Sequence, residues 1–497
     1  MNNTNLTEIF SYESEPIKET YTEGEFILAD YFPPIMRIVR SEARALIRSK
    51  SVHGDKLTVE GLAEFTVIYL SDNGELNSCI HGLPFSNTSD ISSTSGKEYE
   101  VEASVSYLNT RALSPQKLYL KATIEIRNSY TKKTEFSAVT PYSDDSIYTR
   151  NEELNSFEII CSGHKPLKIT DEIKPKSQIK SILRYDVFFN ETEQKILTGK
   201  LISKADMLLK IVYTSTKDEP EVYEQKIAVS QILDMEGITE ETLCNVKYAL
   251  TEFKSNINTS SADKENSLIY EITVNVDAVG YGKTKHLLCS DAFSEKNELK
   301  CTGHIFKECT FCKISKEQSF RESMDIGLYD KLYDISVTPT VLSTDYDKEK
   351  GSILVSGTFS CRTLYTDENN ELSSTEKEIP FMLPVNTDQI SENIKVSAEM
   401  YIKSFAYVEN DSSSVELRID CCYKGLLFSD TEKNILTEIE TDSITFTKES
   451  DRMILYFAEK DEKIWDISKK YKISPELLMK NNGLTDDILK ESLMLKI

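Results

Sequence analysis

The chain has 497 residues, with 58 Lys and Arg against 82 Asp and Glu, and its formal net charge is −24. A surface this acidic repels phosphate backbones and anionic lipid headgroups, which makes nucleic acid and bare membrane poor partners. The length predicts several folded domains. The first residues, Met1 to Pro16, lack the apolar run of a secretory signal, and no later run approaches the roughly 18 apolar residues of a membrane-spanning helix. We therefore expect a cytoplasmic protein whose ten cysteines are reduced thiols.

One segment near the N-terminus returns twice along the chain. Leu57–Tyr69 is matched without gaps by Ile353–Tyr365, 296 residues later, and more loosely by Leu201–Tyr213, 144 residues later. The shorter offset also joins Arg40 to Arg184. In the second copy the glycine and the Pro-Phe pair of the other two copies are replaced, which makes it the divergent copy. These matches predict a domain-sized repeat in three copies.

Each copy has the pattern of an antiparallel sheet. Apolar and polar residues alternate in Leu57–Tyr69, which is typical of a half-buried strand. Asp72-Asn73-Gly74 predicts a tight hairpin turn in the first copy, and Asp367–Asn370 predicts a similar turn in the third. Further strands are predicted over Lys117–Arg127, Ser267–Val276 and Ser414–Tyr423, and exposed loops over Ser86–Gly96, Ser143–Asn155 and Ser255–Asn266. The fold class predicted is mainly β, with three β-sandwich or open-barrel-like repeats.

The repeats divide the chain into five predicted parts. A polar N-terminal segment covers residues 1–20, the first repeat 21–150 and the divergent second repeat 151–294. The third repeat covers 295–449, and a small C-terminal domain covers 450–497.

The C-terminal domain has the pattern of a β-α-α-β unit. Met453–Ala458 predicts a strand, and Ile464, Ile467 and Tyr471 recur at the spacing of one helix face. A second helix is predicted to begin at an N-cap, Ser474, to carry proline in its first turn and to stop at Gly483. The final alternating residues, 493–497, predict a strand that pairs with the first.

This order of motifs resembles a LysM domain, through Ile464-Trp465, Tyr471, Ser474-Pro475-Glu476 and Asn482-Gly483-Leu484. The chain departs from that family at Asp461-Glu462-Lys463 and at Glu491-Ser492-Leu493, where LysM domains usually carry Gly-Asp-Thr and Pro-Gly-Gln. We expect Trp465, the one tryptophan, to pack in the module's own core. The resemblance implies a binding groove for N-acetylglucosamine chains that is lined by Glu462, Lys463, Ile464, Asn482, Gly483 and Leu484.

The repeats are similar to the SPOCS domain of spore-coat proteins, through Phe26–Arg40, Gly54–Gly61 and Val67–Tyr69. Such repeats with a terminal LysM domain resemble the SipL and SpoVID class, which links a SpoIVA-type morphogenetic ATPase of the coat to the forespore surface. The resemblance implies a non-catalytic scaffold in the mother-cell cytoplasm that docks on this ATPase through its LysM domain. The alternative is an anchor that binds peptidoglycan through its N-acetylglucosamine chains. The SPOCS resemblance brings no catalytic residues, and we expect no cofactor.

One group of residues has the spacing of a metal site. Cys301-x-x-His304 and Cys309-x-x-Cys312 supply four zinc-type ligands within twelve residues. Cys161-Ser-Gly-His164 repeats the first half without a second cysteine pair, so we favour a strand edge derived from the repeat over zinc. His-Glu-x-x-His, a nucleophile elbow and a phosphate-binding loop are all missing, so the sequence indicates no enzyme class.

Overall fold

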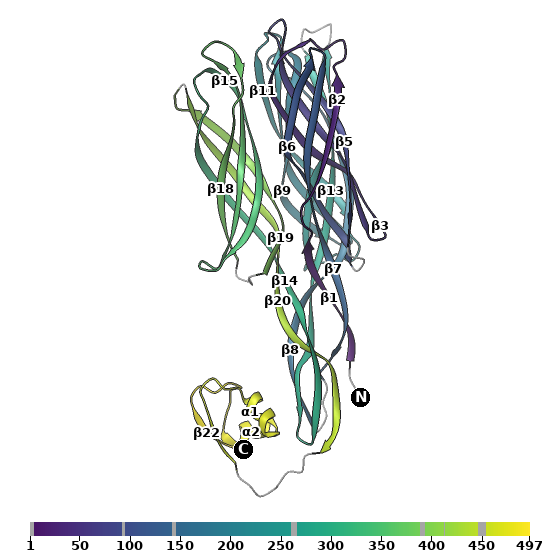
Figure 1. Cartoon of the computed structure of the whole chain (residues 1–497), viewed down its shortest axis with the longest axis vertical. Coiled ribbons are helices and arrows are strands. Elements are labelled where there is room, and N and C mark those ends of the chain that lie inside the picture. The colour runs from purple at the N-terminus through teal and green to yellow at the C-terminus, as the bar shows by residue number, and fades with distance from the viewer. Residues whose placement is uncertain are drawn as a thin grey trace.

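The computed structural model describes residues 4–91, 95–141, 146–259, 266–387, 393–411, 413–445 and 454–497. Within these residues the fold is mainly β, and the only helices are two short ones near the C-terminus. Figure 1 shows an elongated body of long strands, a narrower stalk below it and a small module beside the stalk. The predicted fold class is confirmed.

The first repeat is a sandwich of two antiparallel sheets. One sheet has the order β3-β4-β5, and in the other β7 pairs with β1, β2 and β6. The alternating residues of β4 and β7, such as Phe65 and Ile124, face each other in a shared core. The strands are β1 (Thr4–Ser14), β2 (Lys18–Ile27), β3 (Ile35–His53), β4 (Lys56–Ser71), β5 (Leu76–Asp90), β6 (Ser95–Ser114) and β7 (Lys117–Val139).

The second and third repeats have the same plan. Their sheets have the orders β11-β10-β9 and β12-β13-β8, then β15-β16 with β17 and β18, and β14-β20-β19. The second repeat comprises β8 (Ile147–Ile173), β9 (Ile179–Leu197), β10 (Lys200–Ser215), β11 (Pro220–Asp234), β12 (Leu243–Thr259) and β13 (Asn266–Ser294). The third comprises β14 (Asn297–Asp325), β15 (Tyr329–Asp347), β16 (Ser352–Asp367), β17 (Leu372–Ser373), β18 (Glu376–Asn386), β19 (Asn393–Glu409) and β20 (Ser414–Thr445).

The predicted turns are confirmed, but the predicted loops are too long. Gly74 has φ +83° in the turn between β4 and β5, and Asn370 has φ +62° in the turn after β16. Residues 86–90, 147–155 and 255–258, predicted as loops, lie in β5, β8 and β12. Their Ser, Thr and Asn side chains alternate along long strands whose outer face meets solvent. The predicted loop residues 92–94, 143–145 and 260–265 lie outside the described residues.

A close cross-strand contact explains the glycine of the repeated motif. Gly61 in β4 pairs with Phe85 in β5, and a Cβ atom at Gly61 would lie closer than 3.0 Å to the phenylalanine ring. The corresponding pairs in the other repeats are Gly357 with Phe381 and Ala205 with Val229. The divergent repeat therefore changes both partners together, because the smaller valine side chain leaves room for the alanine methyl group.

The three repeats contact one another in a closed ring. At the rim of the ring, an equivalent ion pair occurs at each of the three junctions, and its glutamate lies at the same place in each repeat, after the hairpin turn. The pairs are Glu75–Lys180 at 3.1 Å, Glu219–Lys331 at 3.0 Å and Glu371–Arg37 at 3.8 Å. Since the third repeat returns to the first, a single chain has the arrangement of a cyclic trimer.

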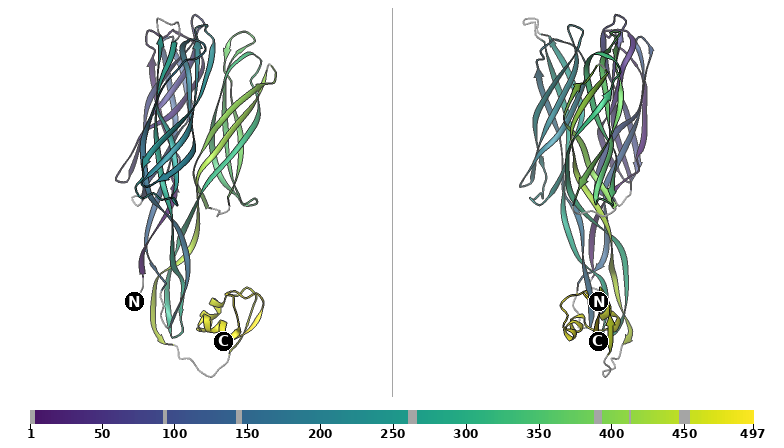
Figure 2. Two further views of the ribbon diagram at one scale, coloured as in Figure 1. Left: turned by 180° about the vertical axis from the view of Figure 1, so that it is seen from behind. Right: turned by 90° about the vertical axis from the view of Figure 1, so that its left-hand side faces the viewer.

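The stalk continues from the sandwiches. β1 with β7, β8 with β13, and β14 with β20 extend beyond the sandwiches as paired strands, which both views of Figure 2 show tapering away from the body. The contact surface inside the stalk is aromatic, and includes stacked Tyr12 and Phe428 rings 4.3 Å apart. The buried members of this cluster are Tyr12, Phe157, Tyr281, Cys309, Phe311, Leu426 and Phe428.

The C-terminal module is a separate β-α-α-β unit. It comprises β21 (Leu455–Ala458), α1 (Ile464–Tyr471), α2 (Pro475–Asn482) and β22 (Leu493–Lys496), with β21 antiparallel to β22. The Ser474 hydroxyl caps α2 by accepting from the backbone N–H of Leu477, and Gly483 ends α2 with φ +63°. Met453, predicted to begin the first strand, lies outside the described residues. Among the helices described, none is long and apolar enough to cross a membrane.

Candidate functional site

The segment at the start of α1, which holds three of the six predicted groove residues, lies beside residues 487–489 of the segment that follows α2. Lys463 is the N-cap of α1 and forms an isolated bridge with Ile488, in the segment that follows α2. On either side of this bridge, the backbone N–H of Leu489 donates to the carbonyl of Glu462 at 3.0 Å, and that of Ile464 donates to the carbonyl of Asp487 at 2.9 Å. The backbone therefore places the loop before α1 against the loop after α2.

The six predicted groove residues have different surroundings. Lys463 and Gly483 are exposed, whereas the side chain of Ile464 is in the module's core and is 1% exposed. The Asn482 amide donates to the carbonyl of Lys496 and accepts from its N–H, so it ties α2 to β22.

The remaining two groove residues are half-buried. The carboxylate of Glu462 accepts a hydrogen bond from Tyr456 at 2.8 Å, and Leu484 packs against the core. The pKa of Tyr456 is raised, and the largest cause is its hydrogen bond to Glu462. A ligand in this groove would meet mainly Lys463, Gly483 and the exposed backbone, and the binding roles of the six residues stay a prediction.

Trp465 does not pack in the module's core, contrary to expectation. That core consists of the buried residues Ala458, Ile464, Ile467, Ile473, Leu478, Leu489 and Leu495. The indole instead points out of α1 toward the stalk, where its N–H donates to the Asp291 carboxylate at 2.8 Å. The helical spacing identified the helix, but the position next to buried Ile464 lies on a different face.

The zinc-like residues do not converge. Cys301, His304, Cys309 and Cys312 all lie in β14, where eleven residues of extended chain span about 36 Å. Cys309 is buried in the aromatic cluster of the stalk, whereas Cys301 packs against a separate cluster of the stalk. No group of three or more His, Cys, Asp or Glu side chains in the described part of the chain has the geometry of a metal site.

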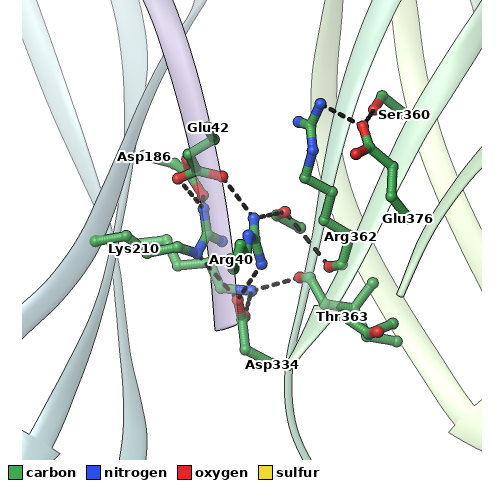
Figure 3. Close-up of polar contacts among 12 residues, drawn as sticks. Arg40, Glu42, Asp186, Lys210, Asp334, Ser360, Arg362, Thr363 and Glu376 are labelled. Atoms are coloured by element: carbon green, nitrogen blue, oxygen red, sulfur yellow. Dashed lines mark hydrogen bonds and ion pairs between the residues drawn. The ribbon is translucent and has the colours of Figure 1, made fainter. Parts of the chain in front are cut away.

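The ring of repeats encloses a buried cluster of ion pairs, which Figure 3 shows. Arg184 of the second repeat is 1% exposed, and its Nε donates to the carboxylate of Asp334 in the third repeat at 3.0 Å. Lys210 lies 2.7 Å from the other oxygen of Asp334. Arg40 of the first repeat donates to Ser336 and to Glu42, both at 2.6 Å. This cluster therefore joins all three repeats at their centre.

The two arginines are equivalent positions of the repeat. Arg40 and Arg184 are 144 residues apart, and the third equivalent position, 296 residues after Arg40, is Ser336. A third arginine would add a further positive charge to a buried site, whereas the serine hydroxyl accepts a hydrogen bond from Arg40. The shared offset of the arginines was visible in the sequence, but their convergence was not.

The cations of this cluster keep its carboxyl groups ionised. Burial acts to raise the pKa of Glu42, but the guanidinium groups of Arg40 and Arg184 outweigh it and lower that pKa to about 2. Burial also acts to raise the pKa of Asp334, and Arg184, Lys210 and Arg40 together lower it well below the usual range. Both carboxylates are therefore ionised at neutral pH.

A second charged layer lies nearer the stalk. Glu102, Lys247 and Glu399 occupy equivalent positions, opposite Arg127, Asp277 and Lys424 in the strand register. The Lys247 ammonium lies 2.8 Å from Glu102, 3.2 Å from Glu100 and 3.8 Å from Glu399. Three carboxylates thus share one lysine, and burial followed by the charge of Glu102 raises the pKa of Glu399 despite Lys247.

The structure so far defines a class of protein: a ring of three β-sandwich repeats on a stalk, with a small β-α-α-β module. Two segments of the chain, residues 34–113 and 178–258, match the family model described as SipL, SPOCS domain. They span β3 to β6 of the first repeat and β9 to β12 of the second. No curated protein and no solved structure matches the chain. The match supports a SipL-like spore-coat protein and includes the divergent second repeat.

Proposed function

We propose that this chain is a non-catalytic scaffold of spore-coat assembly. Its LysM-like module docks on a coat morphogenetic protein, a SpoIVA-type ATPase, at the forespore surface in the mother-cell cytoplasm. The observation that carries the proposal is the similarity of two repeats to the SPOCS domain of SipL. The order of elements in the module supports the assignment of a LysM-like domain.

The architecture suits an adaptor. The repeats bury their charged cluster and close their ring within one chain, so the body presents a fixed frame. The module has its own core and follows the last strand of the stalk, β20. A separately folded module on a rigid body can bind one partner while the body contacts another.

The second candidate function is a peptidoglycan anchor. The observation that favours it is the adjacency of the loop before α1 and the loop after α2, which is the arrangement that the LysM resemblance requires. The departure at Asp461-Glu462-Lys463 changes the loop that would hold the sugar, and the Glu462 carboxylate is engaged by Tyr456. We therefore rank protein docking above glycan binding.

The test is direct binding of the full-length chain to the purified morphogenetic ATPase, with chito-oligomers as competitor. Lys463→Ala removes an exposed side chain of the groove, and Lys480→Ala is the matched control on exposed α2. Asn482→Ala is unsuitable, because its amide holds β22 in place.

We expect the ATPase to bind in the presence of the sugar. The affinity should fall about tenfold in Lys463→Ala, the effect of losing one well-placed interface group, and stay unchanged in Lys480→Ala. Binding of the oligomers without binding of the ATPase would replace the scaffold proposal with the anchor. Binding of neither would reject docking through the module.

A further inference from the structure

In the described part of the chain, the module contacts the stalk at a carboxylate and an aromatic ring of β13, and the Tyr148 hydroxyl of β8 also interacts with Ser474 at the start of α2. The Asp291 carboxylate, on β13, accepts from the Trp465 indole at 2.8 Å and from the Lys469 ammonium at 2.6 Å. The Trp465 ring lies edge-on to Phe293, with ring centroids 5.1 Å apart. Phe293 in turn stacks on Tyr148 of β8 at 5.2 Å. One face of α1 thus contacts two residues of the stalk, the acidic Asp291 and the aromatic Phe293 two positions after it.

The stalk presents this carboxylate from a defined backbone feature. The register of β13 against β8 shifts between Cys289 and Asp291, which is a β-bulge. A bulge adds a residue on one strand and turns the following side chain to a new direction. The hydroxyl of Ser290, the residue between them, donates to the carbonyl of Arg150 and fixes the bulge. The position of Asp291 is therefore set by the strand pair and not by the module.

The module has a hydrophobic core of its own. Its core contains only residues from β21 onward, and Trp465 is absent from it. The side chains of Lys469 and Asp291 are 43% and 28% exposed in the docked arrangement. An ion pair exposed to this extent is weakened by salt. The contact can therefore open while both parts stay folded.

We propose that the Trp465–Lys469 face of α1 is a recognition site for a carboxylate next to an aromatic ring. In this chain Asp291 and Phe293 occupy the site in cis and hold the module closed against the stalk. A protein partner that presents an acidic residue beside an aromatic one competes with the stalk for this face. The site is distinct from the predicted groove, and the proposal holds whichever partner the module binds.

The closed state can be measured in the full-length chain, because Trp465 is its only tryptophan. Its fluorescence emission and its quenching by acrylamide report directly on the contact. Asp291→Ala removes the acceptor of both hydrogen bonds, and Lys469→Ala removes the ion pair. Lys470→Ala is the matched control, because Lys470 lies over the rings of Tyr456 and Tyr471 inside the module.

We expect Asp291→Ala to shift the emission to longer wavelength and to raise the quenching constant about twofold, as the docked population falls. Lys469→Ala should give the same direction with a smaller change, and Lys470→Ala should match the parent chain. Asp291→Asn keeps an oxygen acceptor without the charge, so its quenching should be intermediate and independent of salt. The parent chain should open as salt is raised.

Far-UV circular dichroism verifies that each variant keeps its strands. Equal emission and quenching in the parent chain and in Asp291→Ala at low salt would overturn the proposal. An effect of Lys470→Ala as large as that of Lys469→Ala would do the same, because it would trace the change to the module's interior. Loss of ATPase binding would leave this readout unaffected, so the two proposals fail separately.

Discussion

The centre of the ring and the contact between stalk and module both join residues more than 100 positions apart in sequence, but they differ in burial. At the centre, Asp334 has 1% of its side chain exposed and is contacted by Arg184 and Lys210. At the stalk, Asp291 keeps 28% of its side chain exposed and is contacted by Trp465 and Lys469. At both sites one aspartate is contacted by nitrogen donors from remote parts of the chain.

The difference in burial separates a permanent contact from an exchangeable one. Water cannot reach a buried charge that has lost its partner unless the interface opens. This holds for a carboxylate without its cations and for cations without their carboxylate. An exposed carboxylate that loses its partners is met by water, at little cost. The charges at the centre of the ring are therefore expected to separate only when the ring unfolds. The module, in contrast, can leave the stalk while both parts stay folded.

The largest effect is predicted at the centre of the ring. Asp334→Ala leaves Arg184 and Lys210 buried without their shared counter-charge, and we expect a loss of about 3–5 kcal/mol in the free energy of unfolding. The measurement is urea unfolding followed by circular dichroism. A loss below about 1 kcal/mol, the size found for exposed ion pairs, would contradict the assignment of this site as the permanent contact.

The same aspartate gives the centre a dependence on pH. Burial alone would raise the pKa of Asp334, but Arg184 and Lys210 lower it below its value in the unfolded chain. The stabilisation is therefore complete above the unfolded pKa of about 4 and is lost as pH falls below it. Asp334→Ala should accordingly flatten the fall in stability at acid pH as well as lower its level at pH 7.

The second effect is predicted in the layer of Lys247. Lys247→Met leaves Glu100, Glu102 and Glu399 without their shared ammonium group, and we expect a loss of about 2–4 kcal/mol at pH 7. The loss is smaller than at Asp334, because a carboxyl group that is left without its cation can be neutralised by taking up a proton. An arginine that is left without its carboxylate cannot lose its proton and stays charged.

The pH dependence of the Lys247→Met variant distinguishes it from Asp334→Ala. Without the lysine, burial raises the folded-state pKa values of Glu100 and Glu399 above their unfolded values. Groups of this kind stabilise the fold at low pH, and that stability is lost as pH rises through the folded pKa. Urea unfolding of the variant at pH 5 and pH 7 should therefore show a smaller loss at pH 5. An equal loss at both values would mean that the carboxyl groups do not stay buried together.

The sequence predicted those parts of the fold that depend on local patterns. Alternation in Leu57–Tyr69 identified β4, and the helix start at Ser474 and stop at Gly483 were confirmed by the caps of α2. Polar stretches misled the assignment, since residues 147–155 form the first part of β8. Serine and asparagine on the outer face of a long strand have the same composition as a loop.

The interior of the ring could not be predicted, because it depends on how three repeats meet. Arg40 and Arg184 were found as a repeated pair, yet nothing local indicated that Asp334 would reach both. The direction of Trp465 was missed for a related reason. The spacing of Ile464, Ile467 and Tyr471 defines one helix face, and the partner of the neighbouring face lies in β13, far away in sequence. Ile464, predicted to line the groove, is buried in the module's core, and the sequence pattern did not show this.

The smallest effect is predicted at the rim of the ring, where the repeated ion pairs test whether closure needs exposed charges. Glu371→Gln removes the ion pair between Glu371, whose side chain is 67% exposed, and Arg37, whose side chain is 41% exposed. We expect the free energy of unfolding, measured with urea, to change by at most about 0.5 kcal/mol. Glu75→Gln, at the junction of the first and second repeats, is the matched variant and should behave alike. A loss of several kcal/mol in Glu371→Gln alone would mean that the third repeat is held to the first mainly at its rim. That outcome would mean that the junction between the third and first repeats is the least stable of the three. Asp334→Ala would then be expected to separate the third repeat from the ring before the first and second repeats separate.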